Sequence, residues 1–359
     1  YEHYKEYDIY PEVKELVENE VIPAFVTLKD YLKTLYGKTT SDELTLCKID
    51  EGYAEYTYLI NSSSNRDITD IYNDLVELYF DWIYNFIGIY QDDENILDNY
   101  EEFLKNDEVL NLNAEDLLEY LRNNSSQRYE YLENANYVVS SLDTLGNTTL
   151  GYYVSPPIDN LNQNVIRVNA KIDSDYYDQM SVFEVMAHEG FPGHLYQNIY
   201  FQQTNPHKVR ATQSFVGYTE GYADLAAYDA LEMLDIPNEY KGIARIDSIT
   251  FNSHILYSII DLGVNYFGWN VKTLAKKLDN LMLDSSMAQD LYDTVVAMPG
   301  VFVRYGVGFV SHINLRKKAM DKLGDKFDFV AYDRAIIENG PLPFAILEGV
   351  VEDYINENK

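Results

Sequence analysis

The chain has 359 residues, with 27 Lys and Arg against 59 Asp and Glu, so its formal net charge is −32. This acidity excludes nucleic acid as a partner, because phosphates require a basic face, and it disfavours binding to anionic lipid surfaces. No apolar run approaches the roughly 20 residues of a membrane-spanning helix, so we expect no membrane span. Two explanations of the charge stay open: solubility of a secreted or abundant protein, and binding of a cationic partner.

The chain starts with "YEHYKEYDIY" and carries no initiator Met. We therefore expect it to be the C-terminal part of a longer precursor, without any signal peptide that the precursor had. Cys47 is the only cysteine, so no intrachain disulfide can form and the redox compartment stays open.

The N-terminal third is predicted to be largely helical. Residues 10–37 have apolar side chains at three- and four-residue steps, and residues 67–92 begin with an Asp cap. Between these two helices, the alternation in "GYAEYTYLINSS" (52–63) predicts a short strand that ends in a turn. Residues 92–135 are predicted to form further acidic helices, of which "NAEDLLEYLRNN" shows the clearest pattern.

The composition changes at residues 149–171, which are rich in Pro, Asn and aromatic residues and include the strand-like "NVIRVNA". We expect a β-hairpin or an extended rim next to a cleft there. Helical patterns resume at 178–189, 210–234, 243–267, 271–283, 287–297, 301–323 and 329–338. No internal repeat or clean boundary is visible, so residues 1–359 are predicted to form a single, mainly α domain with a small β-sheet.

The segment "HEGFPGH" places His188 and His194 six residues apart. On an unbroken helix this step leaves the two imidazoles about 120° apart, whereas the four-residue step of H-E-x-x-H leaves them about 40° apart. The two rings can converge only if the helix is interrupted, and Pro192 and Gly193 supply that interruption. The segment therefore predicts a zinc site of the zincin type with two residues looped out.

A zinc peptidase also needs a carboxylate beside the attacking water and a third protein ligand. Glu189 follows His188 and is the candidate general base. Glu220, in the Ala-rich "GYTEGYADLAAYDALEML", is the candidate third ligand. Asp224 lies one turn later, where it would accept the second ring N–H of a ligating histidine. An ordinary exposed position for Asp224 is an equally good interpretation.

Hydrolysis of an amide needs a hydrogen-bond donor for the developing oxyanion. In "MPGVFVRYGVGF", Tyr305 is the candidate donor, and the glycines after it indicate close approach of another element. The alternative is tight helix packing with Tyr305 in the core. His207, His254 and His312 lie outside the pattern of candidate metal ligands, and we expect each to be a surface or packing residue.

These segments together resemble a bacterial family known only as domain of unknown function eight-eight-five, which is similar to zinc peptidases of the gluzincin type. The resemblance covers nearly the whole chain and is most specific in "HEGFPGHLYQ", since the family pattern is H-E-x-x-P-G-H followed three residues later by Gln. Gln197 fits that position, as a partner outside the ligand set. Family members typically carry an additional N-terminal helical region and often an export or lipoprotein signal.

The resemblance implies that His188, His194 and Glu220 bind Zn²⁺, that Glu189 is the base and that Tyr305 is the transition-state donor. The chain departs from the family pattern in "DLGVNYFGW", where Asn265 stands in place of a usual histidine. Asn265 could donate a hydrogen bond to the oxyanion without a positive charge. An equally good interpretation is that it bridges neighbouring helices.

We therefore expect a zincin-like, mainly α hydrolase that cleaves peptides, either short ones or near a chain end, with zinc as cofactor and a peptide as partner. The family's export signals imply an extracytoplasmic location, with a cytoplasmic one left open. Two alternatives remain: a zinc- and peptide-binding protein without turnover, and a metal-free, Tyr-rich binding module. The oligomeric state, the substrate sequence and the choice between endo- and exo-cleavage do not follow from the sequence.

Overall fold

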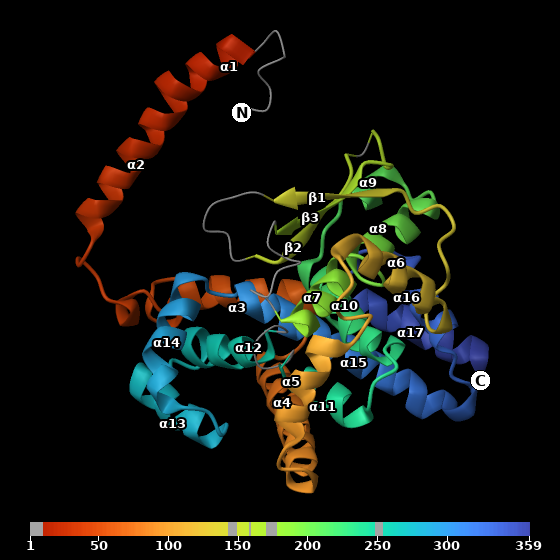
Figure 1. Ribbon diagram of the computed structural model, residues 1–359. Coiled ribbons are helices and arrows are strands. Elements are labelled where there is room, and N and C mark those ends of the chain that lie inside the picture. The colour runs from red at the N-terminus through yellow and green to blue at the C-terminus, as the bar shows by residue number, and fades with distance from the viewer. Residues whose placement is uncertain (1–9, 143–148, 158, 170–177, 248–253) are drawn as a thin grey trace.

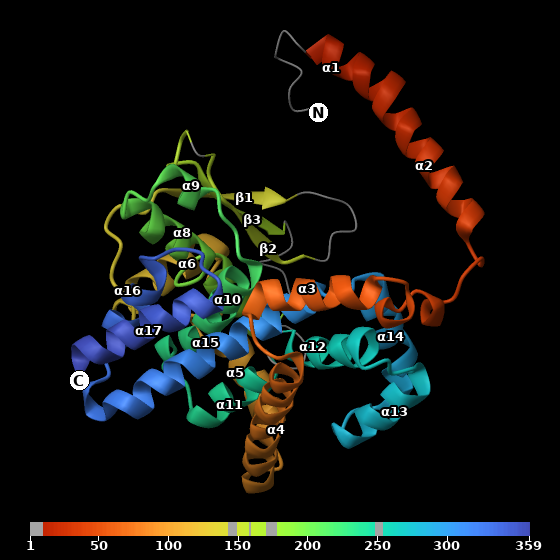
Figure 2. The same ribbon diagram turned by 180° about the vertical axis from the view of Figure 1, so that it is seen from behind.

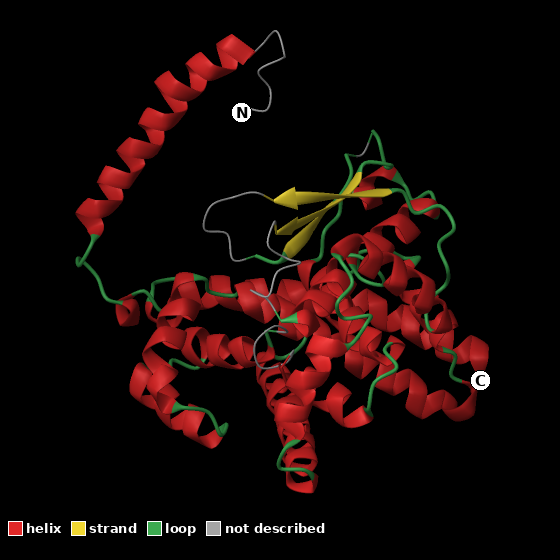
Figure 3. Cartoon of the chain, in the orientation of Figure 1, coloured by secondary structure: helices red, strands yellow, loops and turns green. Residues whose placement is uncertain are grey.

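The computed structural model describes residues 10–142, 149–157, 159–169, 178–247 and 254–359, and in this part the protein is mainly α with one small sheet (Figures 1 and 3). The first eight α-helices along the described chain are α1 (Tyr10–Leu16), α2 (Ile22–Leu35), α3 (Gly52–Ser64), α4 (Ile68–Asp92), α5 (Ile96–Asn106), α6 (Ala114–Asn124), α7 (Gln179–Glu189) and α8 (His194–Gln203). The later helices are α9 (Lys208–Ala211), α10 (Val216–Ala230), α11 (Asn238–Asp247), α12 (Ile255–Asp261), α13 (Val271–Asn280), α14 (Ala288–Ala297), α15 (Val301–Leu323), α16 (Phe329–Ile337) and α17 (Phe344–Asn358).

The sheet has three strands in the order β1-β3-β2. The predicted strand at "NVIRVNA" is β3 (Asn164–Asn169), and it pairs antiparallel with β2 (Gly151–Val154). On its other side it pairs in parallel with β1 (Tyr137–Leu142), a strand that the sequence pattern did not predict. The expected hairpin is therefore part of a mixed sheet in which β2 is an edge strand.

The predicted strand at residues 52–63 is wrong, because this segment forms helix α3. Tyr56 and Ile60 are fully buried and Ser63 and Ser64 nearly so, which places the buried side chains at the four- and seven-residue steps of a helix. The alternation of aromatic and polar residues misled the prediction, since the burial of one helical face overrides a weak two-residue pattern.

The helices enclose two hydrophobic cores that meet at α10 and α15. The first core lies where α6, α7, α8, α10, α16 and α17 meet β3, and the second lies among α3, α4, α12, α13, α14 and α15. Glycines let α10 and α15 approach closely: a Cβ on Gly221 would lie 2.1 Å from the carbonyl carbon of Gly308, and one on Gly308 would lie 1.9 Å from the carbonyl oxygen of Gly217. This contact places Glu220 of α10 near Tyr305 of α15, and it confirms the predicted close approach.

At the N-terminus, α1 and α2 project away from the rest of the protein as one long arm, joined by a π-helical turn (Figures 1 and 2). Neither helix has a buried residue, although Phe25 and Leu32 are large and apolar. The predicted helix at 10–37 is confirmed, and its apolar side chains do not belong to either hydrophobic core.

Among the described residues, no single helix is long and apolar enough to cross a membrane. One bent pair, Ser285–Ala297 with Val301–Lys326, meets the length and composition requirement only when its two parts are joined across a 92° bend. Their side chains Tyr292 and Val303 are fully buried in the second core.

A buried ion pair connects α10 to α15 in the first core. Arg316 lies 2.5 Å from Asp229, and Asp229 also accepts from Arg128 and from the hydroxyl of Tyr129. Burial opposes the charge on Arg316, but Asp229 outweighs it and raises the pKa of the guanidinium above its usual range.

We expect Arg316→Met to lower the free energy of unfolding by about 3–5 kcal/mol, because it leaves the buried Asp229 carboxylate without its closest cation. Urea unfolding would measure the change. Lys318→Met is the matched control on the same helix: Lys318 pairs with Glu348 and Glu352 in a more exposed setting, where an ion pair is worth about 0–1 kcal/mol. Equal losses of unfolding free energy in the two variants would show that the buried pair of Asp229 and Arg316 stabilises the protein no more than the exposed pairs of Lys318 do.

Candidate metal centre

His188 and His194 lie on two successive helices, as the interrupted pattern predicts. Helix α7 ends at Glu189 and α8 begins at His194, and the four residues between them form a tight turn. The turn is closed by the N–H of Gly193, which donates to the carbonyl of Ala187 at 2.9 Å. The chain thus changes direction at the point where an unbroken helix would separate the two rings.

Glycine is required at position 193 by close backbone contact. A Cβ built there would lie 1.8 Å from the carbonyl oxygen of His188 and 2.5 Å from that of Ala187. The turn that joins the two histidines therefore has no room for a side chain at this residue.

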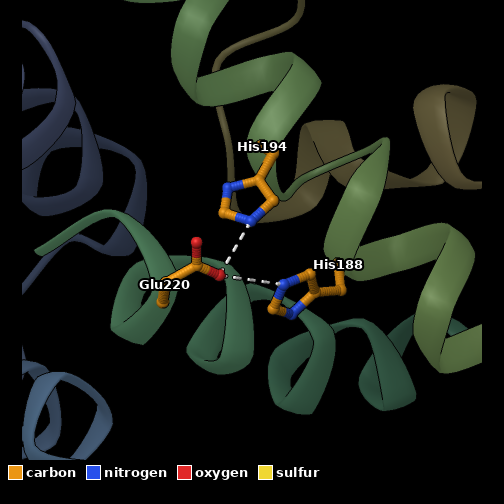
Figure 4. Close-up of side chains that lie close together, drawn as sticks. All are labelled: His188, His194 and Glu220. Atoms are coloured by element: carbon orange, nitrogen blue, oxygen red, sulfur yellow. Dashed lines mark hydrogen bonds and ion pairs between the residues drawn. The ribbon is translucent and has the colours of Figure 1, made fainter. Parts of the chain in front are cut away.

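Three side chains converge in front of this turn (Figure 4). Glu220 Oε2 on α10 lies 3.2 Å from His194 Nε2 and 3.6 Å from His188 Nε2. The nearest ligand atoms of the three residues all lie within 4.8 Å of one another. The predicted ligand set therefore comes together from the successive helices α7 and α8 and from α10.

The arrangement of these three side chains could hold a metal ion. Ligand atoms around a tetrahedral zinc ion, at about 2.0–2.2 Å from the metal, lie roughly 3.4 Å from each other. The contacts of Glu220 Oε2 with His194 Nε2 and His188 Nε2, at 3.2 and 3.6 Å, fall on either side of that value. Two imidazoles and one carboxylate are also the ligand set that leaves a fourth position open for water in catalytic zinc sites.

Asp224 contacts the Nδ1 atom of His188. Its Oδ1 lies 3.1 Å from Nδ1 of His188, and its side chain is almost fully buried. Burial lowers the pKa of His188, but the hydrogen bonds to Asp224 and Glu220 outweigh it and raise the pKa well above 6.5. For Glu220 the signs are reversed: burial raises its pKa, and the bonds to both histidines lower it far below the usual value. The cluster thus stabilises positive charge at the point where the three ligand atoms meet.

Glu189 lines a cavity together with the three candidate ligands, and it is hydrogen-bonded to the sheet. Its Oε2 accepts a hydrogen bond of 2.8 Å from the backbone N–H of Tyr153 in β2. Tyr153 lies opposite Ile166 of β3, and because its N–H donates to Glu189, this N–H points outward from the edge of the sheet. The edge strand therefore borders the cavity of about 360 Å³ that Glu189 and the three candidate ligands line.

Tyr305, the predicted hydrogen-bond donor, lines this cavity as well. Burial, followed by the nearby carboxylates of Glu220 and Asp224, raises the pKa of Tyr305 above its usual value. The phenol is therefore protonated at neutral pH and can donate a hydrogen bond.

His254 was expected to be a packing residue, but it lines the cavity too. Its ring lies against that of Tyr305, with 4.3 Å between centroids. Its Nδ1 is buried without a hydrogen-bond partner among the described residues, and burial lowers the pKa of the ring, so it is neutral at pH 7. No spacing in the sequence connects His254 to the H-E-x4-H segment, since a tertiary contact alone brings it there.

Asn265 lies outside the cavity, in a π-helical turn after α12. It is fully buried, and its Nδ2 donates to Asp261 Oδ1 at 2.7 Å and to the carbonyl of Val295 at 3.0 Å. Its Oδ1 accepts from the N–H of Leu46. The structure thus places Asn265 as a bridge between elements of the second core, and we leave it out of the proposed catalytic group.

Gln197 is buried on α8 and lines a second cavity, of about 430 Å³. This cavity shares Tyr153, His194 and Glu220 with the first, so the candidate metal centre lies where the two cavities meet. Gln197 therefore lines the second cavity and not the first.

We expect Gly193→Ala to weaken zinc binding by at least about tenfold, because the backbone at His188 must move to admit the new Cβ. Titration against a chromophoric chelator would measure the affinity. Gly349→Ala is the control, since no atom lies within 4 Å of a Cβ there. In helix α17, that substitution should stabilise the fold by up to about 1 kcal/mol and leave zinc binding unchanged. Unchanged affinity in Gly193→Ala would contradict the role of the turn.

Comparison with protein families gives one match. The model of the family described as "Bacterial protein of unknown function (DUF885)" matches residues 84–351. No curated protein matches the chain.

Two solved structures are similar in fold. The first is "the putative lipoprotein from Colwellia psychrerythraea", with a TM-score of 0.77 and 17% identity over 95% of this chain. The second is "a putative lipoprotein of unknown function from Shewanella oneidensis", with a TM-score of 0.64 and 14% identity over 92% of this chain. The matches cover 61% and 63% of those two proteins, so the chain spans a little over three fifths of their length. At these identities the likeness concerns the fold alone.

Proposed function

The chain belongs to the DUF885 family of bacterial proteins, and we propose that it is a zinc-dependent peptidase of the gluzincin type. The observation that carries the proposal is the convergence of His188, His194 and Glu220 within one cavity that Glu189 also lines. A bound zinc ion would lower the pKa of water and polarise the carbonyl of the scissile peptide bond.

In this proposal, other side chains that line the cavity carry out or support the remaining steps of peptide hydrolysis. Glu189 takes the proton of the attacking water and passes it to the leaving amine. Tyr305, protonated at neutral pH, donates to the oxyanion, and His254 beside it offers a second polar group to the same cavity. Asp224 fixes the ring of His188 through Nδ1, which leaves Nε2 for the metal.

The class of substrate in this proposal is inferred from the edge strand β2. The outward-facing backbone of an edge strand can add an extended peptide as a further strand. Since Tyr153 places its N–H at Glu189, a peptide bound along β2 would run past the proposed base. A peptide is therefore the substrate that suits the borders of the cavity best.

We also propose an extracytoplasmic location, with export or lipid anchoring as in the putative lipoproteins that this chain resembles in fold. The two similar structures are described as putative lipoproteins, which supports this proposal. A protein outside the cytoplasm can meet peptides from its surroundings, and its strongly acidic charge would keep it soluble there.

The function is tested by stripping the protein with a chelator, reloading it with zinc and incubating each form with a library of short peptides. We expect cleavage by the reloaded form only, with fragments detected by mass spectrometry. Zinc binding with no cleavage of any peptide would favour a binding protein, and absence of zinc binding would reject the metal centre itself.

A further inference from the structure

The two cavities that meet at the candidate metal centre differ in charge. The first is lined by the carboxylates of Glu184, Glu189 and Asp224 in addition to Glu220. Within the described part of the chain, no carboxylate other than the shared Glu220 lines the second cavity, and Arg210 lines it with its guanidinium. Among the residues that the structure describes, Arg210 is the only Lys or Arg that lines either cavity.

The hydrogen bonds of Arg210 to other described residues all go to neutral acceptors. Its Nη1 donates to Gln213 Oε1 and its Nη2 to the carbonyl of Asn339, each at 2.5 Å, and both acceptors are neutral. No carboxylate pairs with Arg210 in the part of the chain that the structure describes. A guanidinium has five N–H donors, so donors remain for an anion in the cavity. In a chain of net charge −32, such a local cation is what an anionic ligand requires.

Gln197 supplies a second, independent observation in the same cavity. The residue is only 5% exposed, and its Nε2 is buried with no hydrogen-bond partner among the described residues. A buried amide donor without a partner is costly, and an acceptor oxygen on a ligand would satisfy it. Gln197 and Arg210 come from α8 and α9, so the chain brings two donors of different elements to one cavity.

We propose that the second cavity is a carboxylate-binding subsite, in which Arg210 pairs with a carboxylate of the bound peptide and Gln197 donates a further hydrogen bond. This inference rests on the proposed peptidase function and specifies its substrate class. The acidic first cavity would repel a carboxylate, so the peptide's orientation across the metal centre is fixed by charge. The carboxylate is either the C-terminus of the peptide, in which case a short C-terminal fragment is released, or an acidic side chain.

The test measures peptide binding by calorimetry with the zinc-loaded Glu189→Gln variant, which keeps the cleft and slows cleavage about 10²- to 10⁴-fold. Three N-acetylated tripeptides are compared: one with a free C-terminal carboxylate, the same peptide as its C-terminal amide, and an amide that carries a Glu side chain. We expect at least one carboxylate peptide to bind about 10- to 100-fold more tightly than the neutral amide. The carboxylate peptide that binds more tightly than the neutral amide identifies the source of the carboxylate.

Adding Arg210→Met should remove this preference, and Arg210→Lys should retain part of it, since Lys keeps the charge but not the paired donors. Lys208→Met is the matched control, because it removes the same charge from an exposed position of the same helix outside the cavity. Thermal unfolding would establish that each variant is folded. Equal binding of all three peptides, or a preference that persists in folded Arg210→Met, would overturn the inference. A carboxylate preference in binding without cleavage by the wild-type protein would instead reject the peptidase function alone.

Discussion

Glu189→Gln should bind zinc like the wild-type protein and hydrolyse peptides about 10²- to 10⁴-fold more slowly. The amide has the size of the carboxylate and can still accept the N–H of Tyr153 through its oxygen. It cannot take the proton of the attacking water, so the loss should fall on kcat. Steady-state rates and zinc content measured on the same preparation test this expectation.

Glu184→Gln is a matched control for that variant, since Glu184 is another carboxylate that lines the first cavity but is not assigned a catalytic role. Its effect on kcat should be much smaller. Undiminished turnover by Glu189→Gln, with contaminating peptidases excluded, would assign Glu189 to a structural role at the edge of β2.

His194→Ala should weaken zinc binding by more than about 100-fold, because removing a direct ligand costs more than the 10- to 100-fold typical of its supporting partners. His194 lies 3.2 Å from Glu220, and no other described imidazole besides His188 belongs to the cluster. Competition with a chromophoric chelator measures the affinity, and peptide hydrolysis should disappear with the zinc.

His207→Ala is the control for the loss of an imidazole outside the cluster. His207 is exposed at the start of α9, where its ring accepts the N–H of Val209. Zinc affinity should not change in this variant. If His194→Ala bound zinc as tightly as His207→Ala, the ion would lie elsewhere in the protein.

The metal cluster was predictable because its signal is local. His188, Pro192, Gly193 and His194 lie within one short segment, and the need for a broken helix follows from helical geometry alone. The helix at 301–323 was also predicted with its observed bounds, since Gly300 and Gly324 mark its ends. Propensity, capping and periodicity all act over a few residues, and these are the features that sequence patterns contain.

The features that were missed depend on contacts between distant segments. His254 enters the cavity because α12 packs on α15, and nothing near it in the sequence resembles a site. Asn265 stands in a family motif, but its partners Leu46 and Val295 lie far from it along the chain and hold it in the core. The predicted helix at 243–267 is observed only at its two ends, since residues 248–253 lie outside the described part. Helix α17 was not predicted, and its buried face is recognised only against α15 and α16.

The most direct test of the metal centre is a crystal of the zinc-loaded protein, measured on both sides of the zinc absorption edge. We expect one anomalous peak at about 2.0–2.2 Å from His188 Nε2, His194 Nε2 and a carboxylate oxygen of Glu220, with Glu189 facing the open position. A peak at any other place, or two imidazoles that point away from each other in the zinc-loaded crystal, would contradict the proposed centre.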